Sequence, residues 1–446
     1  MNIILLSGGS GKRLWPLSND IRSKQFIKFF RTENGEYESM VQRVYRQIRK
    51  TDPAADVVIA APKSQLSSIH NQLGEAVGIS VEPCRRDTFP AITLAAAYLK
   101  DIQKVPEDAA IVVCPVDPFV DDSYFAKLGE MGGQAAKGEA NLVLMGIKPT
   151  YPSEKYGYII PTNEDEISSV ASFREKPDVE TAKVYMQKGA LWNGGVFACK
   201  LGYILQKAHE LIDFADHNDL LAKYETLTKI SFDYAVVEKE PSIQVMRYAD
   251  RWKDLGTWNT LTEAMSEDSV GETIMNDSCT NVHIINELDI PVLAMGLQNI
   301  VISAGPDGIL VSDKEQSSYI KSFVDKLNQQ IMYAEKSWGS YRVLDVGRES
   351  LTIKVVLRPG QRMNYHRHKY RDEKWTVIAG TGDVIVDGKS LAIHAGDSIE
   401  MPAGCCHTVI ARTELEMIEV QLGNSITVQD KEKCQLQGMR CFKGRC

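Results

Sequence analysis

Short runs of consecutive apolar residues alternate with stretches of helical apolar spacing from the N-terminus to about residue 265. Strands are predicted at 57–61, 110–113 and 142–145, and helices at 92–99 and 124–136. Alternation of this kind is typical of a mostly parallel sheet that is covered by helices on both faces. The pattern therefore predicts an α/β domain over residues 1–265, with ligands bound at the carboxyl ends of the strands.

The pattern changes beyond residue 265. A small β module, used as a linker or in oligomerisation, is predicted over 266–334, and it ends in a helix from about 317 to 334. Short alternating strands with glycine turns then predict a compact β-barrel or sandwich over 335–425. The polar and basic residues 426–446 are expected to form a loosely ordered tail. The short β runs of the module fall at 282–285, 291–297, 300–302 and 308–311.

Charge and cysteine content narrow the class of protein. The 446 residues carry a formal charge of −8, which argues against a general nucleic-acid binder. No apolar stretch approaches the ~20 residues that are needed to cross a bilayer, so no membrane partner is expected. The nine cysteines are odd in number and scattered, which fits reduced thiols in a cytoplasmic protein.

The first 26 residues carry the strongest chemical signal. A four-residue apolar run ends in Gly8, Gly9 and Gly11, and the cations Arg13 and Lys24 follow closely. Glycines let the backbone turn tightly, and the N–H groups of such a turn form a cradle for anions. Nothing about a simple turn requires the two cations. The segment therefore predicts a site for a phosphate-rich ligand.

Two common phosphate motifs do not fit this segment. Leu6 stands where a P-loop requires glycine, and Leu14 stands at the third glycine of the dinucleotide fingerprint. The pattern instead resembles the GG-x-G-x-R-L-x-P and Lys-Gln signature of the sugar-nucleotide pyrophosphorylases. Trp15 and the Gln-Phe pair after Lys24 resemble the mannose-1-phosphate guanylyltransferase branch, although Ser23 replaces a proline that many relatives carry.

Later segments resemble further elements of the same family, in the expected order. The resemblance implies a Rossmann-like mixed sheet and assigns Glu82, Arg86 and Thr88 to the nucleotide. Asp117 ends a predicted strand, where a carboxylate is well placed to hold Mg²⁺, and Asp254 is implied as the second Mg²⁺ ligand. The histidine that usually follows the first aspartate is Pro118 here, so only the aspartate is carried over.

The sugar side of the site is implied by three more elements. The resemblance assigns Gly157, Glu175 and Asn193 to the sugar, and Lys176 to the sugar phosphate as well. The implied reaction is attack by mannose 1-phosphate on the α-phosphorus of GTP, which forms GDP-mannose and releases pyrophosphate. Arg13 and Lys24 would bind the triphosphate, so catalysis is positioning and charge neutralisation.

A second motif lies in the predicted barrel. Gly360-x₅-His366-x-His368-x₄-Glu373-x₆-Gly380 is the first cupin motif at every spacing, and the second motif supplies His407 but ends in Ala411 instead of asparagine. Three histidines and one carboxylate suit Zn²⁺, Fe²⁺ or Mn²⁺, and a metal-free cupin with buried polar histidines is the simpler alternative. His394 is off the motif and is expected on the surface.

The fusion resembles bifunctional enzymes that join the guanylyltransferase to a type II mannose-6-phosphate isomerase. Arg371-Asp372-Glu373-Lys374-Trp375 matches the R-x-E-x-W pattern of that family. However, Lys369 and Tyr370 intervene after the second histidine, and Asn364 replaces a common glutamine, so isomerisation of mannose 6-phosphate and fructose 6-phosphate stays open.

Two alternatives are kept. The phosphate machinery identifies neither the base nor the sugar, so another sugar 1-phosphate or nucleoside triphosphate is possible, with a sugar-sensing cupin that is not an isomerase. The second alternative is a binding protein that does not turn over. The protein is expected to be a homo-oligomer.

Overall fold

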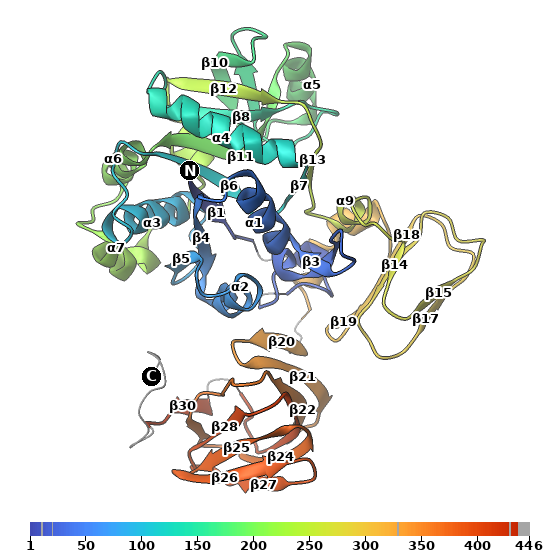
Figure 1. Ribbon diagram of the computed structural model, residues 1–446. Helices are drawn as coiled ribbons and strands as arrows, with labels where there is room; N and C mark the ends of the chain where they lie inside the picture. The colour runs from blue at the N-terminus through green and yellow to red at the C-terminus, as the bar shows by residue number, and fades with distance from the viewer. Residues whose placement is uncertain (10–11, 20, 328–329, 428–429, 436–446) are drawn as a thin grey trace.

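The computed structural model describes residues 1–9, 12–19, 21–327, 330–427 and 430–435. Figure 1 shows an α/β region, a narrow β module beside it, and a separate β-barrel at the C-terminal end. Within these described ranges, no helix combines the length and apolar character that a membrane crossing requires.

A nine-stranded sheet forms the centre of the α/β region. Its order is β5-β4-β1-β6-β11-β8-β12-β10-β9. The strands β5, β4, β1 and β6 run parallel, whereas β11 is antiparallel to both of its main neighbours, so the sheet is mixed as expected. The strands are β1 (Asn2–Leu6), β4 (Asp56–Pro62), β5 (Gly78–Glu82), β6 (Ala110–Pro115), β8 (Leu142–Ile147), β9 (Tyr158–Pro161), β10 (Ile167–Arg174), β11 (Leu191–Lys200) and β12 (Ile243–Tyr248).

Helices cover both faces of this sheet (Figure 1). Apolar side chains of α1, α2, α4 and α5 pack on one face, and those of α3, α6, α7 and α8 pack on the other. Burial of both sheet faces explains the continuous apolar runs of the central strands. The helices are α1 (Met40–Thr51), α2 (Leu66–Leu73), α3 (Thr88–Asp101), α4 (Asp122–Lys137), α5 (Val179–Gln187), α6 (Leu201–Leu211), α7 (His217–Lys223), α8 (Phe232–Ala235) and α9 (Trp258–Thr262).

The β module consists of short strands that stack without intervening helices. β14, β16 and β18 pair in parallel, β19 closes their sheet antiparallel, and β15 pairs with β17. The continuous helix expected over 317–334 is wrong. The described residues form a 3-10 helix at Gln316–Tyr319 and the short α10 (Lys321–Val324), and Ala334 lies in β20. The strands are β14 (Ser269–Val270), β15 (Thr273–Met275), β16 (His283–Asn286), β17 (Val292–Ala294), β18 (Ile300–Gly305) and β19 (Gly308–Asp313).

The C-terminal barrel consists of two sheets that enclose an apolar core. One sheet has the order β20-β21-β22-β29-β24-β27, and the other has the order β26-β25-β28-β23-β30. The strands are β20 (Tyr333–Lys336), β21 (Gly339–Val346), β22 (Ser350–Leu357), β23 (His366–His368), β24 (Asp372–Ala379), β25 (Thr381–Val386), β26 (Lys389–His394), β27 (Ser398–Met401), β28 (His407–Ala411), β29 (Leu415–Leu422) and β30 (Lys431–Lys433).

Two expectations about the C-terminal residues need correction. The segment expected as a loose tail contains β30, which pairs with β23. Cys406 and Cys434 form a disulfide, so the expectation of reduced thiols throughout the chain is wrong for this pair. The number of cysteines did not predict this disulfide, because a count gives no information about which cysteines lie close together in the fold.

A cluster of polar contacts joins the N-terminal segment to both following parts of the chain. Arg22 forms a two-pronged ion pair with Glu287, at 2.7 and 2.8 Å, and lies over the ring of Tyr333 on β20. Asn19 donates to Asp307 at 2.5 Å, and Asp307 also accepts from the backbone N–H of Met332. The segment that carries Lys24 is therefore held by the β module and the barrel.

Arg22→Ala is expected to lower the free energy of unfolding by about 2 kcal/mol, because it leaves the partly buried Glu287 without its cation. Denaturant unfolding of Arg22→Ala, Glu287→Gln and the double variant measures the coupling between the two side chains. Additive effects of the two substitutions would contradict this prediction.

Candidate functional site

A cavity of about 250 Å³ opens in the α/β region near the ends of β6, β8 and β11. Six of the residues that the sequence singled out line it: Asp117, Gly157, Glu175, Lys176, Asn193 and Asp254. These residues lie far apart in the chain, and the fold brings them to one place. Polar and charged side chains make up more than half of its lining residues, which suits a phosphorylated sugar more than an apolar ligand.

The two predicted Mg²⁺ carboxylates converge because of a short strand pair. β7 (Pro118–Val120) pairs antiparallel with β13 (Trp252–Asp254), and Asp254 lies opposite Pro118 in the register. This pairing places Asp254 beside Asp117, which directly precedes β7. Two adjacent carboxylates provide the oxygen ligands that Mg²⁺ prefers.

Lys24 contacts both carboxylates. Its ammonium group lies 2.8 Å from Asp117 and 3.8 Å from Asp254, and it also donates to the carbonyl of Leu255. Burial alone would lower the pKa of Lys24, but the two carboxylates outweigh it and raise the pKa. Burial raises the pKa of Asp254, and Lys24 opposes that shift. Arg13 is exposed and acts electrostatically on both groups.

The glycine turn after β1 is linked to the segment that carries Lys24, because the Gln25 side chain donates to the carbonyl and the hydroxyl of Ser7. Gly8 and Gly9 are exposed, and Gly9 has a φ of +105°, a conformation that favours glycine. The carbonyl of Gly9 accepts from Arg85 at 3.2 Å. Gly11 lies outside the described residues. An open turn with a nearby guanidinium group remains compatible with the predicted triphosphate role.

The three residues predicted to contact the nucleotide lie outside the lining of the cavity. Glu82 is buried at the end of β5 and accepts from the hydroxyl of Tyr224 at 2.7 Å, and burial raises its pKa. Arg86 donates to the carbonyl of Glu225, and the Thr88 hydroxyl accepts from the backbone of Phe232. In this structure they tie the segment from the end of β5 to the start of α3 to residues 224–232, which follow α7. Their nucleotide role stays a prediction.

The sugar side of the cavity has a steric and a hydrogen-bonding component. A Cβ atom on Gly157 would lie 2.5 Å from Glu175 Oε2, so only glycine lets that buried carboxylate approach. Lys176 contacts the same carboxylate and has a φ of +42°, a strained value for a side-chain-bearing residue. Asn193 lies in β11, where the register shifts, and its Oδ1 accepts from the backbone of Gly195.

Sequence reasoning missed one acidic residue of this cavity. Asp233 lines it and accepts from Asn193 Nδ2 at 2.7 Å. Burial, with a contribution from Glu175, raises the pKa of Asp233 to about 6. The sequence of this segment, Ser231-Phe232-Asp233-Tyr234-Ala235, holds no signal that separates Asp233 from its neighbours.

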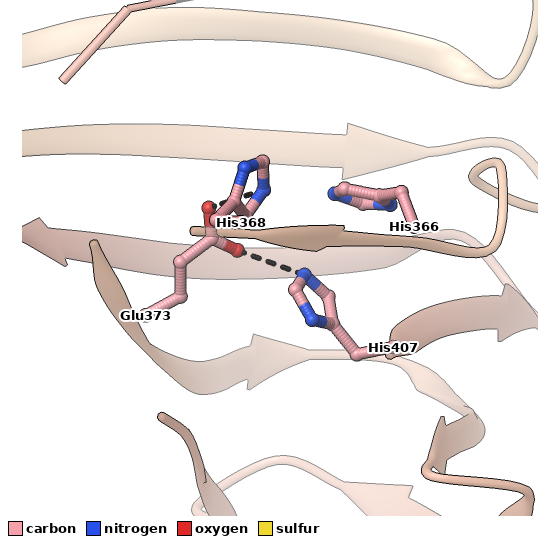
Figure 2. A group of neighbouring side chains, drawn as sticks. All are labelled: His366, His368, Glu373 and His407. Atoms are coloured by element: carbon pink, nitrogen blue, oxygen red, sulfur yellow. Dashed lines mark ion pairs between the residues drawn. The ribbon is translucent and has the colours of Figure 1, made fainter. Parts of the chain in front are cut away.

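The barrel holds the second group of predicted residues together. His366, His368, Glu373 and His407 are all buried, and their potential ligand atoms lie within 4.8 Å of one another. Figure 2 shows the four side chains pointing toward a common centre from three strands, β23, β24 and β28. His366 and His368 lie on one face of β23 with Arg367 exposed between them, as their spacing predicted. His394 is exposed, as expected.

Backbone carbonyls orient all three imidazoles. The Nδ1 atoms of His366, His368 and His407 lie 2.6, 2.7 and 3.1 Å from the carbonyls of Asn364, Asp430 and Cys405. Each Nδ1–H therefore has an acceptor, which leaves Nε2 for a metal. Burial is the largest influence on His366 and lowers its pKa to about 3, so this ring is neutral.

Glu373 completes the cluster. Its two oxygens lie 3.0 Å from His368 Nε2 and 3.1 Å from His407 Nε2, and Arg371 donates to it at 3.0 Å. Burial opposes ionisation of Glu373, but the two neighbouring histidines outweigh it and lower the pKa. Apart from its close approach to Glu373, His407 Nε2 is buried without a hydrogen-bond partner. A transition metal with nitrogen and oxygen ligands would satisfy that atom, so the residues fit the predicted ion.

The fold and these two sites define an α/β protein with a charged cavity and an appended cupin, whose buried histidines and carboxylate could hold a metal ion. Residues 2–270 match the family model described as nucleotidyl transferase, and residues 325–435 match that of mannose-6-phosphate isomerase C-terminal. The first match covers more than half of the chain. The chain therefore belongs to the nucleotidyl transferase family and is a nucleotidyltransferase.

Two curated relatives are similar to this chain over almost the full length of both proteins. The alginate biosynthesis protein AlgA of Pseudomonas putida is 29% identical, over 96% of this chain and 94% of its own. The mannose-1-phosphate guanylyltransferase of Salmonella montevideo is 28% identical, over 94% and 95%. A crystal structure described as mannose-1-phosphate geranyltransferase from Thermus thermophilus is 28% identical, with a TM-score of 0.62, and covers 74% of this chain and 99% of its own.

Proposed function

We propose that this chain transfers a guanylyl group from GTP to mannose 1-phosphate, which forms GDP-mannose and pyrophosphate. The observation that carries the proposal is the convergence of Asp117, Asp254 and Lys24 beside a cavity that also contains Glu175 and Lys176. Guanine and mannose are taken from the names of the relatives, because the structure holds the charged groups that any nucleoside triphosphate would use.

The charges of the site match the charges of the reaction. An oxygen of the sugar phosphate bonds to the α-phosphorus of the triphosphate, and the bond from that phosphorus to the bridging oxygen of pyrophosphate breaks. Lys176 would hold the attacking phosphate, while Arg13 and Lys24 would bind the triphosphate and the departing pyrophosphate. Mg²⁺ bound by Asp117 and Asp254 would neutralise negative charge on the phosphates.

A substrate panel tests the proposal. Purified protein is incubated with each of four nucleoside triphosphates and with mannose, glucose or galactose 1-phosphate, and released pyrophosphate is measured with and without EDTA. GTP with mannose 1-phosphate is expected to give the highest rate, and EDTA is expected to abolish it. A higher rate with another pair would replace the substrate assignment, and no release from any pair would support the binding-protein alternative.

The transferase activity is expected to decrease below about pH 6. The Asp233 carboxylate can accept hydrogen bonds from sugar hydroxyls, and its pKa of about 6 means that it becomes protonated below that pH. In wild type, kcat/KM for mannose 1-phosphate should therefore fall as the pH decreases from 7 to 5. Because phosphate monoesters also titrate near pH 6, Asp233→Asn is the reference, and it should lack the part of the decline that Asp233 causes.

The raised pKa of Asp233 also predicts how the stability of the folded protein depends on pH. The pKa of Asp233 is raised above 3.8, so the folded protein holds this proton more tightly than the unfolded chain does. Its contribution to stability is therefore present below about pH 4 and is lost as the pH rises through about 6. Unfolding of wild type and Asp233→Asn over this range measures the difference, and parallel curves would contradict the assignment.

We further propose that the cupin interconverts mannose 6-phosphate and fructose 6-phosphate when it holds its metal. The two inserted residues that raised doubt are accommodated, because the Asp430 carboxylate accepts from the backbone N–H groups of Lys369 and Tyr370 at 2.9 and 3.1 Å. The imidazole of His368 and the carboxylate of Glu373 therefore remain in contact, at 3.0 Å. A bound metal ion would polarise the sugar oxygens. A coupled assay on metal-loaded and chelator-treated protein tests this activity, and no conversion in the loaded protein would favour the sugar-sensing alternative.

A further inference from the structure

The interior of the cupin contains a second group of polar residues besides the four predicted metal ligands. Leu415 and Met417 point into the barrel core from β29, and the alternation along this strand places Glu419 and Gln421 on the same inward face. Gln421 donates to Glu419 at 2.5 Å, and both are buried. Arg371 is also buried and contacts Glu373.

Lys431 on β30 faces this interior. In the antiparallel pairing of β30 with β23, Lys431 lies opposite His368, so the two side chains share one face of the sheet. The residue as a whole is exposed, but burial of its ammonium end lowers its pKa, and it interacts electrostatically with Glu419, Glu373 and Arg371. Within the described residues, this ammonium group donates no hydrogen bond.

Several contacts fix the strand that carries Lys431. The Cys406–Cys434 disulfide joins the end of β30 to the residue that precedes His407. Asp430 accepts from two backbone N–H groups after β23, and its own carbonyl accepts from His368. Arg371 Nη1 donates to the carbonyl of Thr427 at 2.9 Å. The position of Lys431 is therefore tied directly to the predicted metal ligands.

The charges in this interior are unbalanced. Arg371, Lys431 and a divalent metal ion carry positive charge, and the Glu373 carboxylate offsets part of it. Glu419 and Asp430 are two further buried carboxylates, and even with both ionised the positive charge remains in excess. A partly dehydrated site with excess positive charge favours an anionic ligand, because unpaired charge is costly away from water.

We propose that Lys431 binds the phosphate group of a phosphorylated sugar in the cupin and thereby completes this site from the C-terminal strand. The inference rests on the proposed sugar-phosphate function of the cupin and adds to it the residue that recognises the anion. A flexible ammonium group with three donors is suited to this role.

Calorimetric titration of the full, metal-loaded chain tests the inference, with GDP-mannose present to fill the transferase cavity. The titrants are mannose 6-phosphate, inorganic phosphate and mannose. Lys431→Met is expected to weaken the binding of mannose 6-phosphate at least tenfold and the binding of mannose less than twofold, while the metal content stays the same. Lys431→Arg should restore most of the affinity. Lys389 is an exposed lysine on β26, so Lys389→Met makes the same charge change outside the barrel interior. Its affinities should match those of wild type.

The outcomes separate the inference from the function on which it rests. Mannose 6-phosphate affinity within twofold of wild type in Lys431→Met would overturn the inference alone. Binding that depends on Lys431 without isomerisation would remove the isomerase proposal and leave the inference intact. Failure of wild type to bind either phosphate compound would remove both, and tighter binding of inorganic phosphate than of mannose 6-phosphate would identify a free anion as the ligand.

Discussion

Lys24→Met is expected to lower the rate of pyrophosphate release by about two orders of magnitude, because it removes one charge contact to the transferring phosphates. Loss of such a contact costs on the order of 3 kcal/mol in the transition state. Methionine keeps most of the length of the lysine side chain and removes its charge. Initial rates at saturating GTP and mannose 1-phosphate measure the effect.

The geometry adds a second, distinguishing expectation for this variant. Lys24 occupies the position between Asp117 and Asp254, so it competes with a divalent cation for both carboxylates. Without the ammonium group the two carboxylates repel each other, and Mg²⁺ should bind the nucleotide-free protein more tightly. A lower kcat together with tighter Mg²⁺ binding would separate a direct role of Lys24 from a general disruption of the fold.

Lys28→Met provides the matched control. Lys28 is exposed on strand β2 (Lys28–Arg31), which follows Lys24 in the chain, and its substitution removes the same charge. It should retain wild-type kcat and Mg²⁺ affinity. A rate within threefold of wild type for Lys24→Met would show that the assigned role of Lys24 is wrong.

The N-terminal site shows what a sequence can and cannot predict. Strand-like runs separated by helical spacing predicted the α/β layers, because each layer buries a face of characteristic period. Motif resemblance singled out Asp117 and Asp254, but only the pairing of β7 with β13 explains their convergence. Such a short strand pair carries no periodic signal, since three residues are too few to show alternation.

The cupin illustrates the same limit at its C-terminal strand. The spacing of His366, His368 and Glu373 was readable because these residues lie in one short motif. Lys431 and Cys434 belong to a polar segment without regular spacing, and long-range pairing with β23 places them at the site. The expected helix over 317–334 failed for a related reason, because Ala334 favours a helix locally but pairs with Tyr341 of β21 in the fold.

The cupin cluster is expected to bind one transition-metal ion per chain, and His407→Ala should lower its affinity at least about 100-fold. His407 is a direct ligand candidate whose Nε2 has no other hydrogen-bond partner, so its loss removes a metal bond, whereas loss of an outer-shell partner typically costs 10–100-fold. Metal content after dialysis and competition with a chromogenic chelator measure the affinity.

Thermal unfolding supplies an independent measurement of the same site. A metal that binds only the folded barrel stabilises it by about 2.7 kcal/mol at a concentration of 100 times Kd, so a chelator should lower the Tm of wild type. The Tm of His407→Ala should not respond to the chelator. His394→Ala removes an exposed histidine from the same barrel and should keep both the metal and the chelator response. Equal metal content in His407→Ala and wild type would remove His407 from the ligand set, and a wild-type Tm that ignores both metal and chelator would favour a metal-free cupin.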